Sequence, residues 1–250
     1  MGVKHLWPHA LPDLKNKTPF KHLLHYKGQS VAVDISGMLH AIIRSESVCL
    51  YMSCDPPYPP PHFERVLHSR YKTLMKYFDK VTFVFDGSRH TMKSVARANR
   101  NNTINDAKAA IEEFYKKCNA TPQLVTTADR GVYMSSLKSY TTPDSRVISL
   151  VTDFMRKEGI PFITAPVEAE WQLSYLEKAG LANTIISVDG DCIILGIGRV
   201  IFEIDWQKEL CKEYNHKCIV EKPELYPIAK YDSKYWPLIA CLLGPKTGEI

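Results

Sequence analysis

Short apolar runs that each lead into acidic residues limit most strongly how this chain can fold. Residues 30–37 (SVAVDISG), 81–87 (VTFVFDG) and 183–189 (NTIISVD) each contain a late aspartate, and 161–166 (PFITAP) precedes two glutamates. Stretches with the apolar periodicity of helices separate these runs. Nearly continuous apolar strands that alternate with helices are typical of a parallel sheet buried on both faces. The sequence therefore predicts an α/β fold with a central, mostly parallel sheet flanked by helices.

Four further segments complete the expected pattern of elements. Helices are predicted at 63–78, 145–159 and 168–180, and a last helix at 234–243. In the third helix, an apolar stripe is expected to face the core, and Gly180 is a plausible stop. The residues of that stripe are Trp171, Leu173, Leu176 and Ala179. Trp171 is therefore predicted to be a core residue.

Residues 98–144 interrupt the alternation of strands and helices. The segment is polar, and only 107–118 (AKAAIEEFYKKC) is expected to be helical, with turns elsewhere. A long polar insertion in an α/β domain is usually a surface excursion that binds or covers a site.

Six acidic residues are expected to meet at one edge of the sheet, because parallel strands all deliver their carboxyl ends there. Like charges at close range repel, so such a cluster needs cations. Oxygen ligands select Mg²⁺ or Mn²⁺, and two such ions suit in-line attack of water on a phosphodiester. The six candidate metal ligands are Asp34, Asp86, Glu168, Glu170, Asp189 and Asp191.

Each acidic residue also has a purely structural interpretation. The Asp189-Gly190 pair between two apolar runs is typical of a two-residue hairpin turn. Asp34 could cap a helix, Asp86 could belong to a plain turn, and the two glutamates could favour a helix N-terminus. The coincidence of all these residues at strand ends favours the metal site.

Basic residues dominate positions 70–100, where only Asp79 and Asp86 oppose them, and the whole chain has a net charge of +5. Lys93, Arg97 and Arg100 are spaced to lie along one helix face. A solvated basic face is the plain alternative, but beside a carboxylate cluster phosphate contact explains the run better. The basic residues are Arg70, Lys72, Lys76, Lys80, Arg89, Lys93, Arg97 and Arg100.

The seven cysteines are scattered and form no Cys-x-x-Cys pair, which favours reduced thiols over a zinc site or disulfides. No apolar run in the sequence has the length of a membrane-spanning helix, so no membrane association is expected.

Four stretches of the chain resemble the flap endonuclease and XPG superfamily of structure-specific 5′ nucleases. They are MGVKHLWPHA, VAVDISGMLH, VFDGSRHTMKSVARANR and APVEAEWQLSYLEKAGLANTIISVDGDCIILG. The resemblance covers most of residues 1–244. Leu39-His40 and the strand at 199–205 (RVIFEID) lean towards the exonuclease 1 branch.

The resemblance implies a PIN-like (5′-3′ exonuclease) fold with a helical arch insertion. Residues 1–250 would then form a single nuclease domain, with a first motif region at 1–97, the arch at about 98–144 and a second motif region at about 145–250. The six carboxylates would hold two Mg²⁺ or Mn²⁺ ions. The residues implied in catalysis are Asp34, Asp86, Lys93 and Arg100, and those implied in nucleic-acid binding are Gly2, His40, Lys93, Arg97 and Arg100.

Two departures from the family pattern stand out. The family's seventh carboxylate follows a helix whose counterpart here ends at Gly244, where Pro245 to Thr247 follow instead. Asp232 is a possible substitute but is expected to cap the last helix, and Glu249 is a weaker candidate; the second ion is therefore expected to bind more weakly. The family's helix-hairpin-helix region is absent or truncated, and Trp171 stands where a small residue is usual.

Two functions from different classes follow. The first is a metal-dependent 5′ nuclease acting in DNA repair on DNA with 5′ ends or flaps, with RNA as another possible substrate. The second is a nuclease-like scaffold or nucleic-acid-binding protein with reduced or lost catalysis, which the missing seventh carboxylate favours. A phosphatase would leave the basic run and the insertion unexplained. A monomer in the nucleus is expected, with the cytoplasm or mitochondrion as alternatives.

Overall fold

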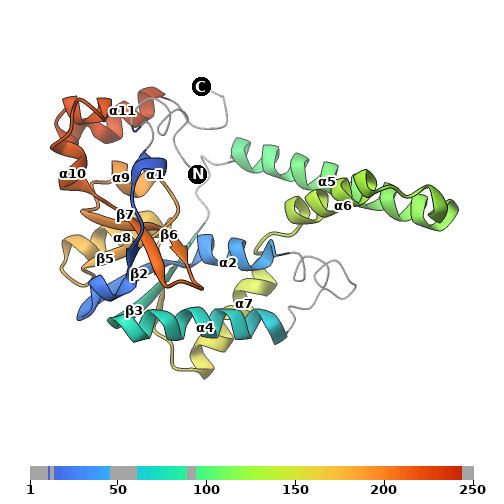
Figure 1. Cartoon of the computed structure of the whole chain (residues 1–250), viewed down its shortest axis with the longest axis horizontal. Helices are drawn as coiled ribbons and strands as arrows, with labels where there is room; N and C mark the ends of the chain where they lie inside the picture. The colour runs from blue at the N-terminus through green and yellow to red at the C-terminus, as the bar shows by residue number, and fades with distance from the viewer. Residues whose placement is uncertain (1–10, 12–13, 46–60, 89–93, 244–250) are drawn as a thin grey trace. The chain divides into compact units, whose positions relative to one another are not determined.

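A computed structural model describes residues 11, 14–45, 61–88 and 94–243 of the chain. Its centre is a seven-stranded sheet with the strand order β1-β7-β6-β5-β2-β3-β4 (Figure 1). Neighbouring strands from β6 to β4 run parallel, and β7 pairs antiparallel with both β6 and β1. The prediction of a central, mostly parallel sheet is confirmed.

Strands β2 to β6 lie where the sequence predicted strands, including the one at 199–205, whereas β1 and β7 were not predicted. Their bounds are β1 Lys21–His22, β2 Gln29–Asp34, β3 Phe78–Phe85, β4 Phe162–Thr164, β5 Thr184–Ile186, β6 Arg199–Asp205 and β7 Leu210–Asn215. In the central strand β2, the last four residues are all buried, and so is the whole of β5. Burial of consecutive residues means that both faces of the sheet are covered.

Helices cover the two faces of the sheet. Successive side chains of a strand point to opposite faces. Val84 belongs to one buried cluster with Leu173 of α8 (Ala169–Lys178), whereas Phe83 faces Tyr71 of α4 (Pro61–Tyr77), with 6.1 Å between ring centres. Apolar residues on both sides of the strand therefore explain the layered arrangement.

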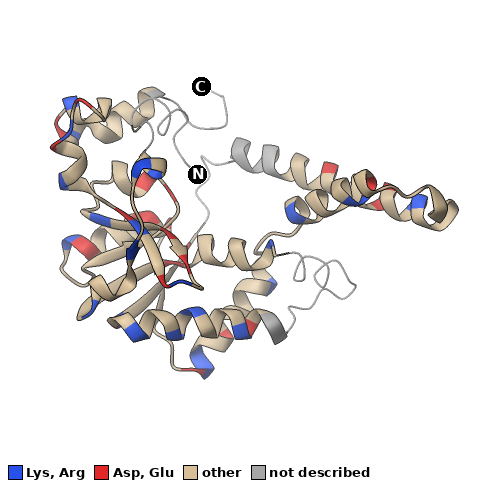
Figure 2. Cartoon of the chain, viewed as in Figure 1, with Lys and Arg blue, Asp and Glu red and all other residues tan. Residues whose placement is uncertain are grey.

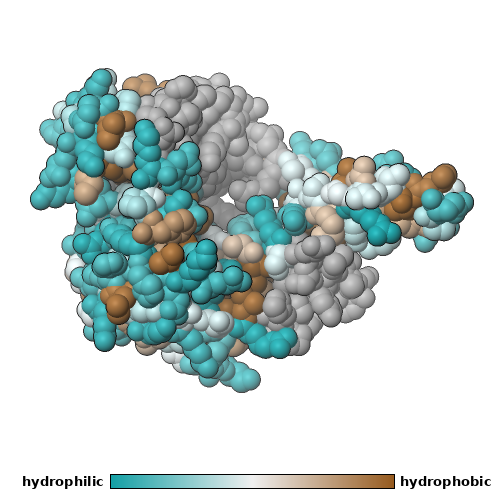
Figure 3. Space-filling model, viewed as in Figure 1, coloured by the Kyte–Doolittle hydropathy of each residue, from teal (hydrophilic) through white to brown (hydrophobic). Residues whose placement is uncertain are grey.

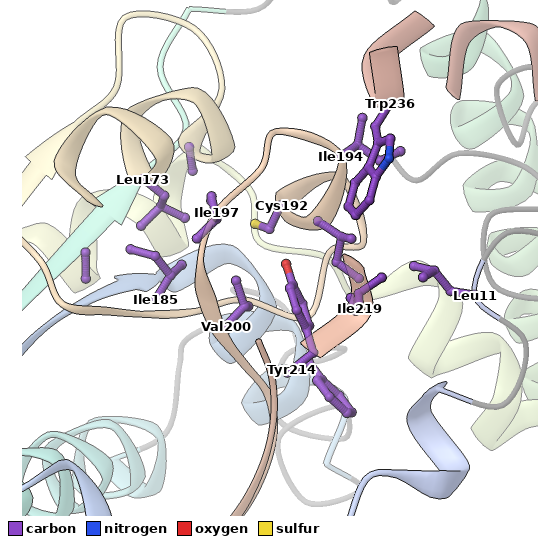
Figure 4. Close-up of a cluster of buried hydrophobic side chains, with 14 of the residues drawn as sticks. Leu11, Leu173, Ile185, Cys192, Ile194, Ile197, Val200, Tyr214, Ile219 and Trp236 are labelled. Atoms are coloured by element: carbon purple, nitrogen blue, oxygen red, sulfur yellow. The ribbon is translucent and has the colours of Figure 1, made fainter. Parts of the chain in front are cut away.

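The cluster on the α8 side extends to the C-terminal helices. Figure 4 shows Leu173, Cys192 and Tyr214 gathered with Trp236 between strands and helices. These residues come from α8, from the short α9 (Asp191–Ile194), from β7 and from α11 (Trp236–Leu243). One apolar core thus joins the sheet to segments that are distant in sequence.

The remaining elements are short or lie in a second compact unit. They are α1 Leu14–Lys17, η2 Leu23–Tyr26, α2 Ile35–Ile43, α5 Ser94–Ala120, η4 Pro122–Leu124, α6 Thr127–Tyr140, α7 Ser145–Lys157, α10 His216–Val220, η5 Pro227–Lys230 and η6 Ser233–Tyr235. The predicted helices at 63–78, 145–159, 168–180 and 234–243 correspond to α4, α7, α8 and α11.

The chain divides into two compact units. The first comprises residues 1–37, 70–88 and 160–250 and holds the sheet, and the second comprises 38–69 and 89–159. The assignment of the whole chain to one nuclease domain stays a prediction. The described residues include no helix long and apolar enough to span a membrane.

Residues 98–144 are far more helical than expected. Helices α5 and α6 lie side by side as a hairpin (Figure 1), and the expectation that only 107–118 is helical is wrong. Ile111 and Leu137 are buried between the two helices, and the rings of Phe114 and Tyr133 stack 4.3 Å apart. Most helical stability in proteins comes from such tertiary packing rather than from propensity.

The turn between α5 and α6 is also well defined. The side chain of Thr126 and the carboxylate of Asp129 form a capping box at the start of α6. Lys117 of α5 pairs with Asp129 at 2.7 Å. Residues of both charge signs lie along the hairpin (Figure 2), and hydrophobic residues gather at its tip (Figure 3).

Candidate active site

The carboxyl ends of four parallel strands carry the acidic residues. Asp34 is the last residue of β2, Asp86 directly follows β3, and Asp189 follows β5 within three residues. Because β2 pairs in parallel with both β3 and β5, these three ends lie next to one another. The predicted acidic residues at this edge are called the acidic rim: Asp34, Asp86, Glu168, Glu170, Asp189 and Asp191.

The two glutamates of the acidic rim come from the next strand of the sheet. Strand β4 pairs in parallel with β3 and leads into α8. Glu168 is the N-cap residue of α8, and Glu170 lies in its first turn. Negative charge is favourable at a helix N-terminus, so the helix tolerates both residues.

Two serine hydroxyls and two backbone amides fix Asp34 and Asp86. Ser187 donates a hydrogen bond of 2.9 Å to Oδ2 of Asp34, whose Oδ1 accepts one from the Ser36 backbone. The Ser36 hydroxyl donates to Oδ2 of Asp86 at 2.9 Å, and the backbone N–H of Ala169 donates to Oδ1. Ser36 thus links the ends of β2 and β3, and Ala169 ties α8 to Asp86.

Burial is the main cause of shifted proton affinities at the acidic rim. Burial raises the pKa of Glu170 to about 7, and the charges of Asp34, Asp189 and Asp86 add to this rise. Burial likewise raises the pKa of Asp34 to about 6, against the hydrogen bonds from Ser187 and Ser36 that lower it. Carboxylates that destabilise one another in this way favour a bound cation.

The Asp189-Gly190-Asp191 segment is not a hairpin turn. Strands β5 and β6 are parallel, and the segment leads into α9, which begins at Asp191. The backbone N–H of Asp191 donates to Oδ1 of Asp189 at 3.1 Å, and the Asp189 N–H donates to the Ser187 hydroxyl. The strand-end interpretation of these two aspartates is therefore correct.

A close backbone approach holds the two acidic loops together. The N–H of Gly87 donates to Val167 O at 2.7 Å, and the N–H of Ser88 donates to Pro166 O at 3.2 Å. A Cβ atom on Gly87 would lie 1.7 Å from the carbonyl oxygen of Ala165. Only glycine allows this approach, which brings the loop after Asp86 against the loop that precedes the glutamates.

The donor set suits a hard divalent cation. All six side chains supply carboxylate oxygens, the ligands that Mg²⁺ and Mn²⁺ prefer. Within the described residues, no three acidic, cysteine or histidine side chains converge closely enough to enclose one ion. The carboxylates are instead spread along this edge of the sheet, so the assignment of individual ligands stays a prediction.

Most of the predicted nucleic-acid contacts lie where the structure gives no side chains. Gly2 and Lys93 are outside the described residues, and so are the side chains of Arg97 and Arg100, whose backbone lies in α5. His40 is half-buried in α2. Their roles stay predictions.

The first part of the basic run contributes to the fold. The Arg70 guanidinium lies 5.1 Å from the ring centre of Trp206, and Lys76 pairs with Glu209 at 2.8 Å. These two cations therefore have partners in the protein itself.

Two expectations about single residues have opposite outcomes. Asp232 caps η6, which leads directly into α11, by accepting a hydrogen bond of 3.0 Å from the Lys234 N–H, as expected. Trp171 is 63% exposed, so its prediction as a core residue is wrong. In α8 the buried side includes Leu173 and Leu176, whereas Ala179 is exposed like Trp171. Pro245 to Thr247 and Glu249 lie outside the described residues.

No separate sequence signal marks the groups that support the acidic rim. Nothing in the sequence marks Ser36 and Ser187 as partners of the aspartates. Only the strand register brings the Ser187 hydroxyl to Asp34 and the Ser36 hydroxyl to Asp86. The sequence around Gly87 is consistent with a simple turn after Asp86. The approach of Gly87 to Ala165 cannot be predicted from it, because Ala165 is 78 positions further along the chain.

Comparison with known proteins assigns both halves of the site to one family. The XPG N-terminal domain matches residues 1–107, and the XPG I-region matches residues 159–244. Exodeoxyribonuclease 1 of Saccharomyces cerevisiae is 25% identical over 260 residues, which cover 100% of this chain and 34% of the relative. The DNA damage-inducible protein DIN7 of the same yeast is 26% identical over 244 residues, which cover 98% of this chain and 52% of DIN7. The chain thus spans about a third to a half of the length of these relatives.

Solved structures share the fold. The catalytic core of Rad2 in complex with DNA substrate matches with a TM-score of 0.59 and 20% identity, over 97% of this chain and 62% of that one. The Holliday junction-resolving enzyme GEN1, in complex with product DNA and Mg²⁺, matches with a TM-score of 0.55 and 17% identity. This match covers 96% of the present chain and 45% of the GEN1 chain. The predicted PIN-like fold is confirmed by these likenesses. With both XPG domains matched around the acidic rim, the chain belongs to the flap endonuclease and XPG superfamily.

Proposed function

We propose that this chain is a divalent-metal-dependent 5′ nuclease that hydrolyses phosphodiester bonds near the 5′ ends or flaps of DNA. The observation that carries the proposal is the acidic rim, where the parallel strands β2, β3 and β5 bring the ends that carry Asp34, Asp86 and Asp189 next to one another. Membership of a superfamily whose members include enzymes named exodeoxyribonuclease supports it.

Two Mg²⁺ or Mn²⁺ ions are expected at the acidic rim, with all six carboxylates as ligands. Bound there, the ions would polarise the scissile phosphate and supply a nucleophilic water at neutral pH. The protein's own contribution is to hold the carboxylates: Ser187 and Ser36 orient Asp34, and the Ala169 N–H orients Asp86. Oriented carboxylates lose little free energy to rearrangement when they act.

Basic residues are proposed to bind the nucleic-acid substrate. Lys93 and Arg100 would contact the scissile phosphate and offset the negative charge that grows in the transition state. Arg97, His40 and Gly2 would contact the adjoining nucleic acid, and the α5–α6 hairpin would form the arch beside a 5′ strand. Because phosphate contacts dominate affinity, binding should weaken steeply with salt.

The wider assignments follow from the same site. DNA is the expected substrate, and a role in DNA repair in the nucleus accords with a relative named for DNA-damage induction. A monomer suffices, because all six carboxylates come from one chain. Loss of catalysis is the less favoured function, since the acidic rim retains every one of these six residues.

Cleavage of a 5′-labelled flap or recessed-end duplex in Mn²⁺ tests the proposal. We expect short labelled products near the 5′ end, and none when a chelator removes the metal. A duplex with blunt, blocked ends is the matched control and should stay intact. Absence of cleavage at a large excess of protein, with binding retained, would favour the scaffold function instead.

A further inference from the structure

Two large aromatic side chains stand exposed on the helix that begins in the acidic rim. Trp171 and Tyr175 of α8 are 63% and 61% exposed. Residues four apart lie on the same helix face, with Cβ atoms roughly 5–6 Å apart. Within the part of the chain that the structure describes, neither ring has a hydrogen bond or a ring contact with another side chain.

Three other exposed aromatic residues contact a neighbouring side chain. The Lys212 ammonium lies 4.6 Å from the ring centre of Phe20, and the Lys234 ammonium lies 4.9 Å from that of Tyr235. The hydroxyls of Tyr115 and Tyr133 form a hydrogen bond. Exposing a large aromatic ring forgoes the burial that normally stabilises it. The pair on α8 therefore has no visible role in stabilising the fold.

The direction of the helix places Trp171 next to the first turn of α8, which belongs to the acidic rim. Side chains on an α-helix lean toward its N-terminus, so Trp171 covers the turn that holds Glu168 and Glu170. Tyr175 lies one turn further along and covers the turn of Trp171. The platform formed by Trp171 and Tyr175 thus begins at the carboxylates and extends away from them.

The neighbouring surface mixes apolar and charged groups. Val167 is exposed and directly precedes Glu168 at the start of α8. The exposed Lys178 lies three residues after Tyr175 and hence on the same face as the two rings. A ligand for this surface needs flat apolar faces next to negative charges, a combination that nucleobases on a phosphate backbone provide.

We propose that Trp171 and Tyr175 form a stacking platform for the unpaired nucleobases next to the scissile phosphate. The inference rests on the proposed nuclease function and extends it, because it assigns base stacking to the helix whose N-terminal end carries two of the metal-binding candidates. Stacking tolerates any base, so the platform gives affinity for single strands without sequence preference.

Binding measurements with defined probes test the platform. The Asp86→Asn background keeps the probes intact, and fluorescence anisotropy reports affinity for a duplex with a single-stranded 5′ tail. Trp171→Ala is expected to weaken binding of this probe about tenfold, and Trp171→Phe to restore most of the loss. With an abasic 5′ tail, which has phosphates but no bases, the same variants should bind alike.

The matched control is Tyr231→Ala, which removes an equally exposed aromatic ring from the segment before η6. It should leave both probes unaffected. Equal affinity of Trp171→Ala and its parent for the tailed probe would overturn the platform, and would point to a protein segment as occupant of this face. An equal loss on the abasic tail would overturn base stacking as well. Cleavage by the unmodified protein is scored separately, so failure of the nuclease function is distinguishable from failure of the platform.

Discussion

Replacing Asp86 by alanine is expected to lower the rate of metal-dependent cleavage by at least about a hundredfold, because one charged metal ligand is lost. Asp86 also accepts hydrogen bonds from the Ala169 N–H and the Ser36 hydroxyl. Asp86→Asn keeps an oxygen that accepts from the Ala169 N–H, and its amide NH2 can donate to the Ser36 hydroxyl oxygen, so the variant removes the charge and keeps the shape. It should lose cleavage to a similar extent with little loss of stability. Single-turnover cleavage of a 5′-flap duplex measures the effect.

The control for Asp86 is the exposed carboxylate of Asp232. Asparagine caps helices as well as aspartate does, so Asp232→Asn keeps the cap on η6. Cleavage by Asp232→Asn should equal that of the parent, and DNA binding by Asp86→Asn should be equal or tighter since a negative charge is removed. Normal cleavage by both Asp86 variants would contradict the acidic rim as the catalytic centre; loss in Asp232→Asn would instead identify a seventh ligand.

Replacing Gly87 by alanine is expected to destabilise the protein by at least about 2 kcal/mol. The added Cβ would lie 1.7 Å from Ala165 O and 2.9 Å from Pro166 C. Both are backbone atoms, so no side-chain rotation relieves the clash. The loops that carry Asp86 and Glu168 must then separate, and cleavage should fall together with the free energy of unfolding, measured by urea denaturation.

A matched glycine tests whether the effect is local. Gly131 lies in α6, and a Cβ atom there meets nothing within 4 Å. Gly131→Ala should stabilise the helix by roughly 0.5–1 kcal/mol, because alanine has the higher helix propensity. Similar urea midpoints for Gly87→Ala and Gly131→Ala would contradict the close approach at Gly87.

The acidic rim could be predicted because its signal is local. Each strand is a short apolar run with its own acidic end, and the rule that parallel strands share a carboxyl edge places Asp34, Asp86 and Asp189 together without further knowledge. The supporting serines could not be predicted in the same way. Ser187 meets Asp34 across 153 positions of sequence, and that contact depends on the register of β5 against β2.

The helical hairpin shows the opposite limit. Helix α5 is polar on most of its surface, so its sequence lacks the apolar stripe that marks a core helix. Its order comes from α6, through Ile111 against Leu137 and Phe114 against Tyr133. Sequence periodicity within one segment cannot reveal a partner that is itself polar.

The wrong prediction that Trp171 is a core residue has a related cause. A large apolar residue among Leu173, Leu176 and Ala179 suggests a stripe, yet the structure buries Leu173 and Leu176 and exposes the other two. The outcome is a functional clue, since an exposed tryptophan beside carboxylates is more informative than a buried one.

Anomalous diffraction from crystals soaked in Mn²⁺ tests the central claim most directly. The account predicts two manganese peaks at the acidic rim, roughly 3.5–4 Å apart, with carboxylate oxygens of Asp34, Asp86, Glu170 and Asp189 among the ligands. One peak would contradict the two-ion mechanism and leave a single-ion site. Ordered crystals with no manganese peak at these carboxylates would contradict the assignment of the acidic rim as a metal centre.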